Sequence, residues 1–260
     1  MHEDRTYAVT GALSGIGAAT ADWLRAAGAR VIACDLEAGD VAADLATAAG
    51  RAAMAEGVAR LSAGRLDGVV ANAGGGPAET MVALNFFGAV ATLEGLRPLL
   101  AESKAPRAVV ISSVSSLGPA DQALVDACLS LDEPSAVAAG ARMLRAGKTG
   151  LDLYGSAKQA LNRWCRRAAV TATWADAAIP LNAIAPGVVD TPAAAWLLSS
   201  AQGRTEMAQR TPLPTARPAS ADQLAALAAW CVGPANSLMT GQVLFADGGL
   251  ECLARGEAAW

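Results

Sequence analysis

The chain has 260 residues, of which 53% are hydrophobic and 17% charged, and its formal net charge is −4. This composition excludes a disordered chain, and the length suits one α/β domain with a substantial core. The acidic balance and the lack of a basic stripe argue against nucleic acid or an anionic membrane as a partner.

Short β-like runs alternate with longer helical patterns along the chain. This alternation predicts a parallel sheet with helices on both faces, wound in two directions from its centre. Strands are expected at residues 7–10, 31–35, 41–44, 67–71, 108–112, 181–185 and 242–245. Helices are expected at residues 17–28, 47–62, 80–103, 153–174 and 221–231.

Two segments interrupt this alternation without dividing the chain. Residues 117–148 form an irregular, partly helical insertion, and residues 193–218 contain small helical pieces among Thr and Pro. No internal repeat or long linker is present, so we expect one domain over residues 1–260.

Histidine and cysteine content restricts the chemistry and the compartment. His2 is the only histidine, so a Ser-His-Asp triad or a histidine-rich metal centre is nearly excluded, and no metal is expected. The five cysteines are odd in number and have no Cys-x-x-Cys spacing, which predicts reduced thiols in a cytoplasmic protein. We expect no signal peptide before the first strand, and no apolar run is long enough to span a bilayer.

A glycine-rich turn connects the first predicted strand to its helix. Glycines permit a tight turn and a close approach of the backbone to phosphate, and the helix N-terminus offers unpaired N–H groups to a pyrophosphate. The strand–turn–helix context predicts a dinucleotide site, with an ordinary glycine-rich turn as the alternative. The expected cofactor contacts are Gly11, Ser14, Gly15, Ile16 and Gly17.

Asp35 ends the second predicted strand, where a carboxylate can accept hydrogen bonds from the adenosine ribose. It would repel a 2′-phosphate, and Leu36 and Glu37 offer no cation to hold one, so NAD is favoured over NADP. A loop or capping aspartate is the alternative. Asn72, Ala73 and Gly74 follow the strand at 67–71, and their position in the strand order predicts that they line the same crevice.

Tyr154 and Lys158 lie four residues apart on a predicted helix and therefore share one face. A nearby ammonium is expected to lower the tyrosine pKa and to make the phenol an acid or base near neutral pH. A surface lysine beside a packed tyrosine is the alternative. Ser113 follows the strand at 108–112 toward the same crevice, and Asn85 lies within an apolar helix, where a polar side chain needs partners.

Together these motifs resemble the short-chain dehydrogenase/reductase family over essentially the whole chain, in family order and with its Rossmann-type fold. The resembling motifs are Thr10-Gly11-x-x-x-Gly15-x-Gly17, Asn72-Ala73-Gly74, Asn85, Ser113, Tyr154-x-x-x-Lys158, Pro186-Gly187 and Asp247-Gly248-Gly249.

The resemblance implies a role for each of these positions. Tyr154 would be the proton donor or acceptor, Lys158 would lower its pKa and hold the ribose, Ser113 would bind the substrate oxygen, and Asn85 would anchor a water. Contacts with the nicotinamide end are implied for Pro186, Gly187, Val189 and Thr191, and contacts with the adenine for Asp44 and Leu45. The reaction would be hydride transfer between NAD and a small-molecule alcohol or ketone.

Two departures from the family pattern point to a subgroup. Only residues 36–40 join the second and third strands, so the usual crossover helix is expected to be missing. The long insertion at 117–148 is similar to that of bacterial 3α-hydroxysteroid dehydrogenase/carbonyl reductases and coniferyl-alcohol dehydrogenases. In most of this family the helix that begins at Tyr154 packs in a dimer interface, and an insertion beside it would block that surface. We therefore expect a homodimer through the C-terminal strand and helix 221–231, with a tetramer less favoured.

The segment 193–218 is expected to cover the substrate with apolar side chains, among them Trp196, Leu197 and Met207. An apolar, ring-containing alcohol or ketone fits, and the choice between a steroid, a terpenoid and an aryl alcohol stays open. A non-catalytic dinucleotide-binding protein is the second functional class. An NADP-linked ketoreductase is disfavoured by Asp35, and an enoyl reductase by the short Tyr–Lys spacing.

Overall fold

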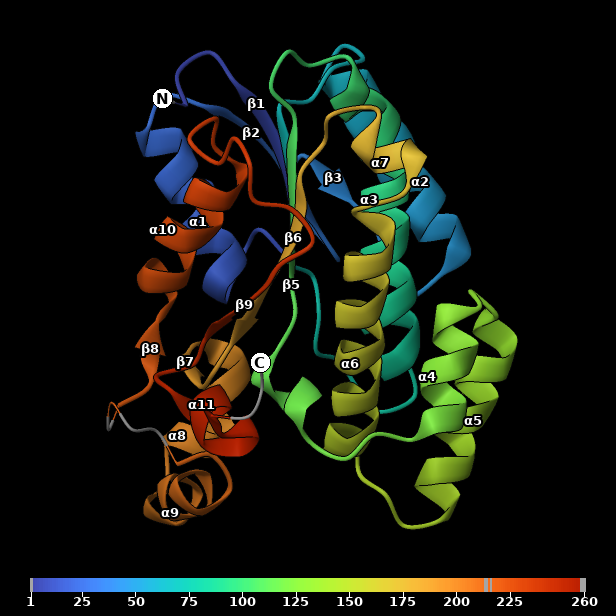
Figure 1. The fold of residues 1–260 in the computed structure, drawn as a ribbon, viewed down its shortest axis with the longest axis vertical. Helices are drawn as coiled ribbons and strands as arrows, with labels where there is room; N and C mark the ends of the chain where they lie inside the picture. The colour runs from blue at the N-terminus through green and yellow to red at the C-terminus, as the bar shows by residue number, and fades with distance from the viewer. Residues whose placement is uncertain (1, 213–214, 216, 258–260) are drawn as a thin grey trace.

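The computed structural model describes residues 2–212, 215 and 217–257, without side-chain placement at 196–197, 206–207 and 209–210. A seven-stranded sheet forms its centre, in the order β3-β2-β1-β4-β5-β6-β9 (Figure 1). All six neighbouring pairs are parallel. The strands are β1 (Thr6–Thr10), β2 (Arg30–Asp35), β3 (Val41–Ala42), β4 (Gly68–Ala71), β5 (Arg107–Ile111), β6 (Leu181–Pro186) and β9 (Val243–Ala246).

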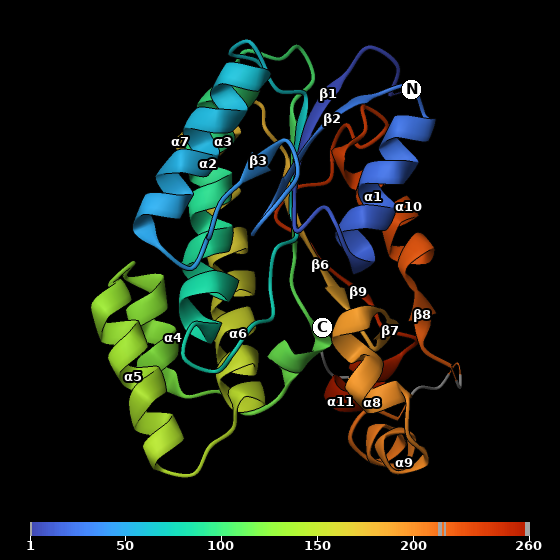
Figure 2. The same ribbon diagram turned by 180° about the vertical axis from the view of Figure 1, so that it is seen from behind.

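Helices cover both faces of the sheet, as Figures 1 and 2 show from opposite sides. One face carries α1 (Gly15–Ala26) and α10 (Ala221–Val232), and the other carries α2 (Ala48–Leu61), α3 (Ala89–Ala101) and α6 (Gly150–Ala168). A separate apolar cluster fills each face, the first around Leu24 and Leu224 and the second around Phe86, Leu93 and Trp164. The predicted doubly wound parallel sheet is therefore confirmed.

The first crossover contains no helix, as the short spacing predicted. Residues 36–40 return the chain in a tight loop, in which the Asp40 amide donates to the Ala33 carbonyl at 2.8 Å. The Asp40 carboxylate accepts from the Ala33 amide at 2.7 Å, and Gly39 adopts a φ of +101°. The third strand is shorter than the predicted 41–44, because Asp44 already turns the chain by accepting from the Ala46 amide.

Two predicted helices have different bounds in the structure. The helix expected at 80–103 contains a π-helical stretch, η1 (Ala83–Gly88), before α3 begins, so its hydrogen-bonding pattern changes around Asn85. Helix α6 begins before residue 153, because Thr149 and Asp152 form a capping box at its start. It ends at Ala168, and a short helix α7 (Ala172–Ala175) follows where a continuous helix was predicted.

The insertion forms two helices that pack against each other and against α6. Helix α4 (Gln122–Leu129) is capped by Asp121 and helix α5 (Glu133–Arg145) by Asp132, each through a side-chain oxygen that accepts a backbone N–H. Arg51 of α2 pairs with Glu133 of α5, with N–O distances of 2.9 and 2.5 Å. The insertion is therefore an ordered helical pair and not an irregular segment.

Several short elements complete the chain. The 3-10 helix η2 (Val114–Leu117) follows β5, and the strands β7 (Val189–Asp190) and β8 (Ala219–Ser220) pair with each other. The segment 193–218, the predicted substrate lid, contains most of η3 (Pro192–Ala194) and all of α8 (Ala195–Leu198) and α9 (Ala201–Arg210), and α11 (Leu250–Arg255) lies near the C-terminus. None of the described helices is both long and apolar enough to cross a membrane.

Candidate active site

Two adjoining cavities lie at the carboxyl ends of the strands, beside the point where the strand order reverses between β1 and β4. One has a volume of about 440 Å³ and the other about 580 Å³. They share a wall made of Gly11, Ser14, Ala73, Gly74 and Gly76. A long ligand could therefore occupy both cavities by passing over this small-residue wall.

The glycine turn between β1 and α1 is built for close backbone approach. Gly11 and Gly15 have φ angles of +62° and +51°, and a Cβ on Gly11 would lie 2.8 Å from Asn72 Nδ2. A Cβ on Gly17 would overlap the Gly11 carbonyl oxygen. Ser14 is the N-cap of α1 and its side chain makes no capping hydrogen bond, while Gly15 and Ile16 of the first turn line the larger cavity, so the N–H groups of this turn are available to an anion.

Asn72 fixes this turn to the end of β4. Its Nδ2 donates to the carbonyl oxygens of Thr10 and Gly11 at 3.0 and 3.1 Å. Thr10 Oγ1 in turn accepts from the amides of Asn72 and Ala73 at 3.0 and 3.1 Å. The two loops that face a dinucleotide are thus joined to each other, which keeps the crevice in shape.

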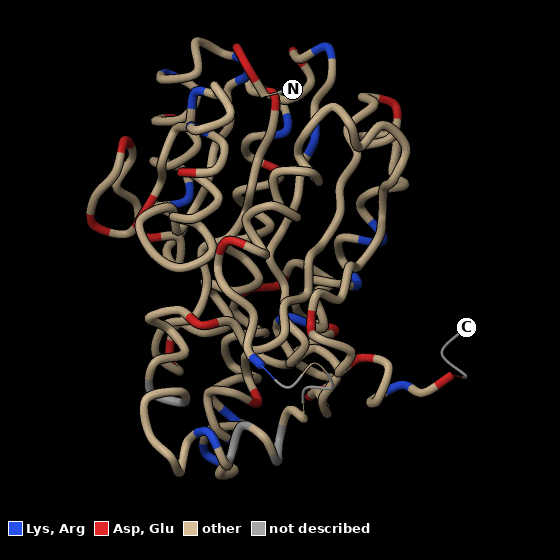
Figure 3. The backbone as a smooth tube through the Cα atoms, turned by 90° about the vertical axis from the view of Figure 1, so that its left-hand side faces the viewer, with Lys and Arg blue, Asp and Glu red and all other residues tan. Residues whose placement is uncertain are grey.

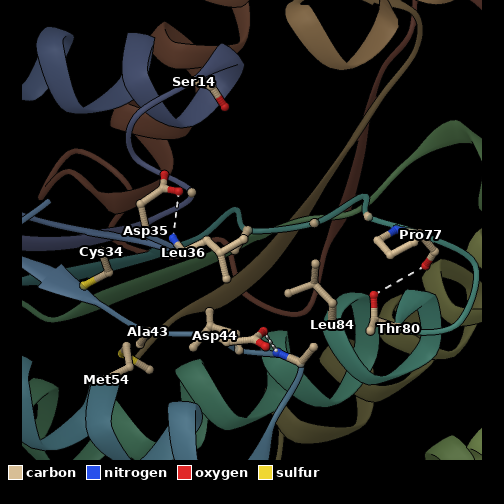
Figure 4. A pocket seen from close by; sticks show the side chains of 16 residues that line it. Ser14, Cys34, Asp35, Leu36, Ala43, Asp44, Met54, Pro77, Thr80 and Leu84 are labelled. Atoms are coloured by element: carbon tan, nitrogen blue, oxygen red, sulfur yellow. Dashed lines mark hydrogen bonds between the residues drawn. The ribbon is translucent and has the colours of Figure 1, made fainter. Parts of the chain in front are cut away.

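The smaller cavity contains the predicted adenosine contacts (Figure 4). Asp35 lies at its edge, and its carboxylate accepts from the amides of Leu13 and Leu36 at 2.9 and 2.8 Å. Leu36, Asp44 and Leu45 line the same cavity. Sequence reasoning missed the rest of its wall, which includes Cys34, Met54, Pro77, Thr80 and Leu84. These residues carry no pattern beyond apolar packing, so no signal in the sequence distinguishes them from core.

The larger cavity brings the predicted catalytic side chains together. Ser113, Tyr154 and Lys158 all line it, and so do Pro186, Gly187, Val189 and Thr191. Thr191 packs against the glycine turn, since a Cβ on Gly15 would lie 3.2 Å from Thr191 Cγ2. The proton-transfer groups and the expected nicotinamide contacts therefore line one and the same cavity.

Lys158 is buried beneath Tyr154. Its Nζ donates to the Ile111 carbonyl at 2.8 Å and lies 5.5 Å from the centre of the Tyr154 ring. Burial lowers the pKa of Lys158 to about 7, so the ammonium is only partly charged near neutral pH.

The predicted lowering of the tyrosine pKa is wrong for this structure. Burial raises the pKa of Tyr154 above its usual value of 10.0, and a hydrogen bond with Ser113 opposes this shift without cancelling it. The reason is that burial disfavours the charged phenolate more than the hydrogen bond with Ser113 favours it. At neutral pH the phenol is protonated and can donate a hydrogen bond to an oxygen in the cavity.

Two predicted site residues lie behind the cavities and do not line them. Gly17 packs against Gly11, and Asn85 is fully buried in η1. Asn85 Oδ1 accepts from the Gly75 amide at 2.9 Å, and Nδ2 donates to the carbonyls of Gly75 and Met81 at 2.9 and 2.8 Å. Asn85 thus fixes the position of Gly75, which itself lines the larger cavity.

The substrate end of the larger cavity is apolar. Met81, Leu151 and Pro192 line it and were missed by sequence reasoning, whereas Ala193 and Ala194, which also line it, belong to the segment 193–218 that was predicted to cover the substrate. Leu151 precedes Tyr154 by one helical turn, a spacing that could have indicated it. The predicted substrate contacts Trp196, Leu197 and Met207 are on α8 and α9, but their side chains lie outside the part of the chain that the structure describes.

Known proteins similar to this chain agree with the geometry. Two family models match consecutive segments, "short chain dehydrogenase" over residues 5–125 and "Enoyl-(Acyl carrier protein) reductase" over residues 131–251. A 3-alpha-hydroxysteroid dehydrogenase/carbonyl reductase of Comamonas testosteroni is 36% identical over 95% of this chain and 96% of the relative.

Solved structures show the same architecture. The 3-alpha-hydroxysteroid dehydrogenase from Pseudomonas sp. B-0831, complexed with NADH, superimposes with a TM-score of 0.88 at 34% identity, covering 97% of this chain and 99% of that one. The RhlG/NADP active-site complex of Pseudomonas aeruginosa gives a TM-score of 0.74 at 28% identity, covering 95% and 96%. The chain belongs to the short-chain dehydrogenase/reductase family and is an oxidoreductase close to the hydroxysteroid dehydrogenase/carbonyl reductases.

Proposed function

We propose that the protein is an NAD(H)-dependent oxidoreductase that interconverts an uncharged, apolar, ring-containing alcohol and its carbonyl compound. One observation carries the proposal: Ser113, Tyr154 and Lys158 converge on a cavity that continues into a dinucleotide-shaped crevice. The glycine turn fits a pyrophosphate, because side chains at Gly11 and Gly17 would close the approach and the N-terminus of α1 has no side-chain cap.

In this mechanism the bound nicotinamide supplies or accepts the hydride. Ser113 donates a hydrogen bond to the substrate oxygen and holds it beside Tyr154. Tyr154 gives its phenolic proton to that oxygen in carbonyl reduction and takes a proton back in alcohol oxidation. Lys158 holds the ribose of the cofactor and, once charged, favours the phenolate. Asn85 holds the loop at Gly75 through two hydrogen bonds, and its proposed role is to anchor a water there.

Several features favour NAD over NADP. Asp35 places a carboxylate at the edge of the adenosine cavity, and Asp44 adds a second one. None of the described residues that line this cavity is Lys or Arg, so a 2′-phosphate would meet negative charge without a compensating cation. The similar Pseudomonas sp. structure contains NADH, which supports the same choice.

The lining of the larger cavity supports an uncharged substrate. Lys158 is the only charged residue among the described residues that line it, and the mechanism already uses it. The apolar surface offered by Met81, Leu151 and Pro192 suits a ring system, and the lid residues Trp196, Leu197 and Met207 are proposed to add to it. Reduction of an enoyl double bond is not proposed, because the spacing from Tyr154 to Lys158 is the short one of the alcohol dehydrogenases.

We further propose a cytoplasmic homodimer. β9 ends the sheet, Trp230 of α10 is 44% exposed, and Leu238, in the connection between α10 and β9, is 88% exposed. Lys and Arg are interspersed with Asp and Glu along the described chain, which gives no support for a nucleic-acid partner (Figure 3). Sedimentation of the wild type and of a Trp230→Lys variant tests the dimer, and a wild-type monomer would refute it.

The function is tested by following formation of reduced cofactor with NAD and, separately, NADP over hydroxysteroids, terpenoid alcohols, aryl alcohols and simple secondary alcohols. The proposal expects turnover with NAD and at least one apolar ring alcohol. Faster turnover with NADP would refute the cofactor assignment. Cofactor binding without turnover of any alcohol or ketone would favour a non-catalytic dinucleotide-binding protein.

A further inference from the structure

The proposed catalytic serine and tyrosine come from different elements, so their relative position depends on how those elements are joined. Ser113 directly precedes η2, whereas Tyr154 and Lys158 lie on α6. Gly155 lets the two elements approach, since a Cβ there would lie 2.9 Å from the Ser115 carbonyl oxygen. One and two turns further along α6, the same face carries Gln159 and Asn162.

Asn162 begins a chain of hydrogen bonds that ends on Ser113. Its Nδ2 donates to Ser116 Oγ at 2.9 Å, and Ser116 Oγ donates to the Ser113 carbonyl oxygen at 2.7 Å. The Ser116 amide donates to the same carbonyl at 3.1 Å. These contacts fix the plane of the peptide that follows Ser113, and hence the direction in which the Ser113 side chain projects toward the cavity.

The polarity of the chain determines how Asn162 must be oriented. Ser116 has a single hydroxyl proton and uses it on the Ser113 carbonyl, so Asn162 has to present its amide N–H group and not its oxygen. Asn162 Oδ1 is thereby left as the one buried side-chain N or O atom, among the residues described, that has no hydrogen-bond partner. An unpaired buried acceptor destabilises the folded state. The bond from Asn162 to Ser116 therefore has a cost in stability, which points to a role other than stabilising the fold.

We infer that Asn162 is a positioning residue for Ser113 and acts through Ser116. The inference rests on the proposed function, in which Ser113 and Tyr154 must reach the same substrate oxygen at once. Ser113 Oγ accepts from the Ser115 amide at 3.1 Å and donates to Ser115 Oγ at 3.2 Å, so a shift of its backbone would change the direction in which its one proton can turn from Ser115 to a substrate oxygen. A misplacement of about 1 Å in such a group can lower a rate by roughly 10²-fold.

The test is an Asn162→Leu variant, which has a similar size but no donor and no unpaired oxygen. We expect kcat for carbonyl reduction to fall on the order of 10- to 100-fold. The Kd of NADH should stay unchanged, because the hydrogen bonds from Asn162 through Ser116 end on Ser113, which is proposed to bind the substrate and not the cofactor. Tm should be unchanged or higher, because the unpaired Oδ1 is removed. In a Ser113→Ala background the same substitution should cause no further loss, since its effect passes through Ser113.

Two further variants complete the test. Ser116→Ala breaks the chain at its centre and should reproduce the kcat loss. Gln159→Leu is the matched control, because Gln159 Nε2 donates to the Ser116 carbonyl oxygen at 3.3 Å and lies outside the chain, so kcat should stay close to wild type.

Each outcome has a distinct meaning. An Asn162→Leu enzyme with wild-type kcat, or one that loses equal activity in the Ser113→Ala background, overturns the positioning role. A wild-type protein that reduces no carbonyl compound with either cofactor overturns the proposed function and the positioning role with it.

Discussion

The two tyrosines of the chain, Tyr7 and Tyr154, lie toward opposite ends of the sheet in polar clusters of different character. Tyr7 is fully buried, and its hydroxyl is paired with His2 Nδ1 and Arg5 Nε, both at 2.8 Å. Tyr154 is half-buried and faces the larger cavity beside Ser113 and Lys158. Burial raises the pKa of both phenols, so the pKa shift does not distinguish a catalytic tyrosine from a structural one.

The clusters differ in how much hydrogen-bonding capacity is left over. Around Tyr7, Arg5 also donates to the carbonyls of Asp67 and Ala105, and the Asp67 carboxylate accepts from Thr6 and Ser103. Lys158 has three N–H donors, and one of them is bonded to a described carbonyl, that of Ile111. A polar cluster with unused donors beside a cavity can bind a ligand, whereas a saturated cluster holds the fold together.

Exchanging each tyrosine for phenylalanine tests this distinction most strongly. Tyr154→Phe removes the proposed proton donor, so kcat should fall on the order of 10³-fold while NAD binding and Tm stay close to wild type. Steady-state rates and calorimetric titration with NAD measure the two effects.

Tyr7→Phe is the matched control for that substitution. It should leave kcat near the wild-type value but lower the free energy of unfolding by about 1–2 kcal/mol, because His2 and Arg5 lose a buried partner. Comparable activity losses in both variants would show that the two clusters do not differ in the way proposed.

Lys158→Met should abolish activity and yet stabilise the cofactor-free protein. The folded lysine has a pKa of about 7 against 10.5 for the free group, so the unfolded chain binds more protons between these values. Wild-type stability should therefore rise with pH in this window, by up to about 1.4 kcal/mol per pH unit.

The advantage of the Lys158→Met variant should accordingly be largest at pH 7 and below and should shrink toward pH 10.5. Denaturant titrations of both proteins across this range measure it. A wild type that is the more stable protein at pH 7 would contradict the buried-lysine interpretation.

The rate of alcohol oxidation should respond to pH through Tyr154. Oxidation needs the phenolate, and burial raises the pKa of this group, so kcat for oxidation should increase with pH beyond neutrality while carbonyl reduction is favoured at lower pH. Rate profiles in both directions provide the measurement. A rate of oxidation that falls on going from neutral to alkaline pH, in a protein that stays folded, would contradict this assignment.

Asp35→Ala should change cofactor preference more modestly. Loss of the carboxylate at the adenosine cavity should lower the ratio of kcat/KM for NAD to that for NADP by about 10-fold, which corresponds to about 1.4 kcal/mol. Glu37→Gln removes the same charge two residues away, from an exposed position outside the cavity lining, and should leave the ratio unchanged. Equal shifts in both variants would indicate a general charge effect.

The smallest effect is expected from the ion pair that fastens the insertion. Arg51 and Glu133 have side chains that are 12% and 29% exposed, so Glu133→Gln should lower the free energy of unfolding by about 1 kcal/mol. kcat should hardly change, because the pair lies outside both cavities. A large loss of activity would instead connect the insertion to catalysis.

Much of the fold and of the site could be predicted, because hydrophobic periodicity indicates the strands and helices and the order of the motifs indicates which strand ends form the site. Buried parallel strands such as β5 read as continuous apolar runs, and the tyrosine and lysine on α6 are positioned by helical spacing alone. The strand order then places Ser113 and Asn72 at the same edge of the sheet.

The remaining features depend on tertiary contacts that a linear pattern does not contain. The π-helical stretch contains Asn85, whose side chain bonds to Gly75, ten residues away in the sequence. The low pKa of Lys158 follows from burial beneath Tyr154. The β7–β8 pair joins segments about 30 residues apart through two residues each, too few for a periodic signal.

The central claim is that Tyr154 and Ser113 activate a carbonyl oxygen in the larger cavity, where Pro186, Gly187, Val189 and Thr191 would hold the nicotinamide that supplies the hydride. The most direct measurement uses NADH that carries deuterium at the transferable position, with a ring ketone that the wild type reduces, and locates the label by mass spectrometry. The account predicts one deuterium on the carbinol carbon of the product, and no product with Tyr154→Phe on the same time scale. An alcohol without deuterium, or full activity in the Tyr154→Phe variant, would contradict it.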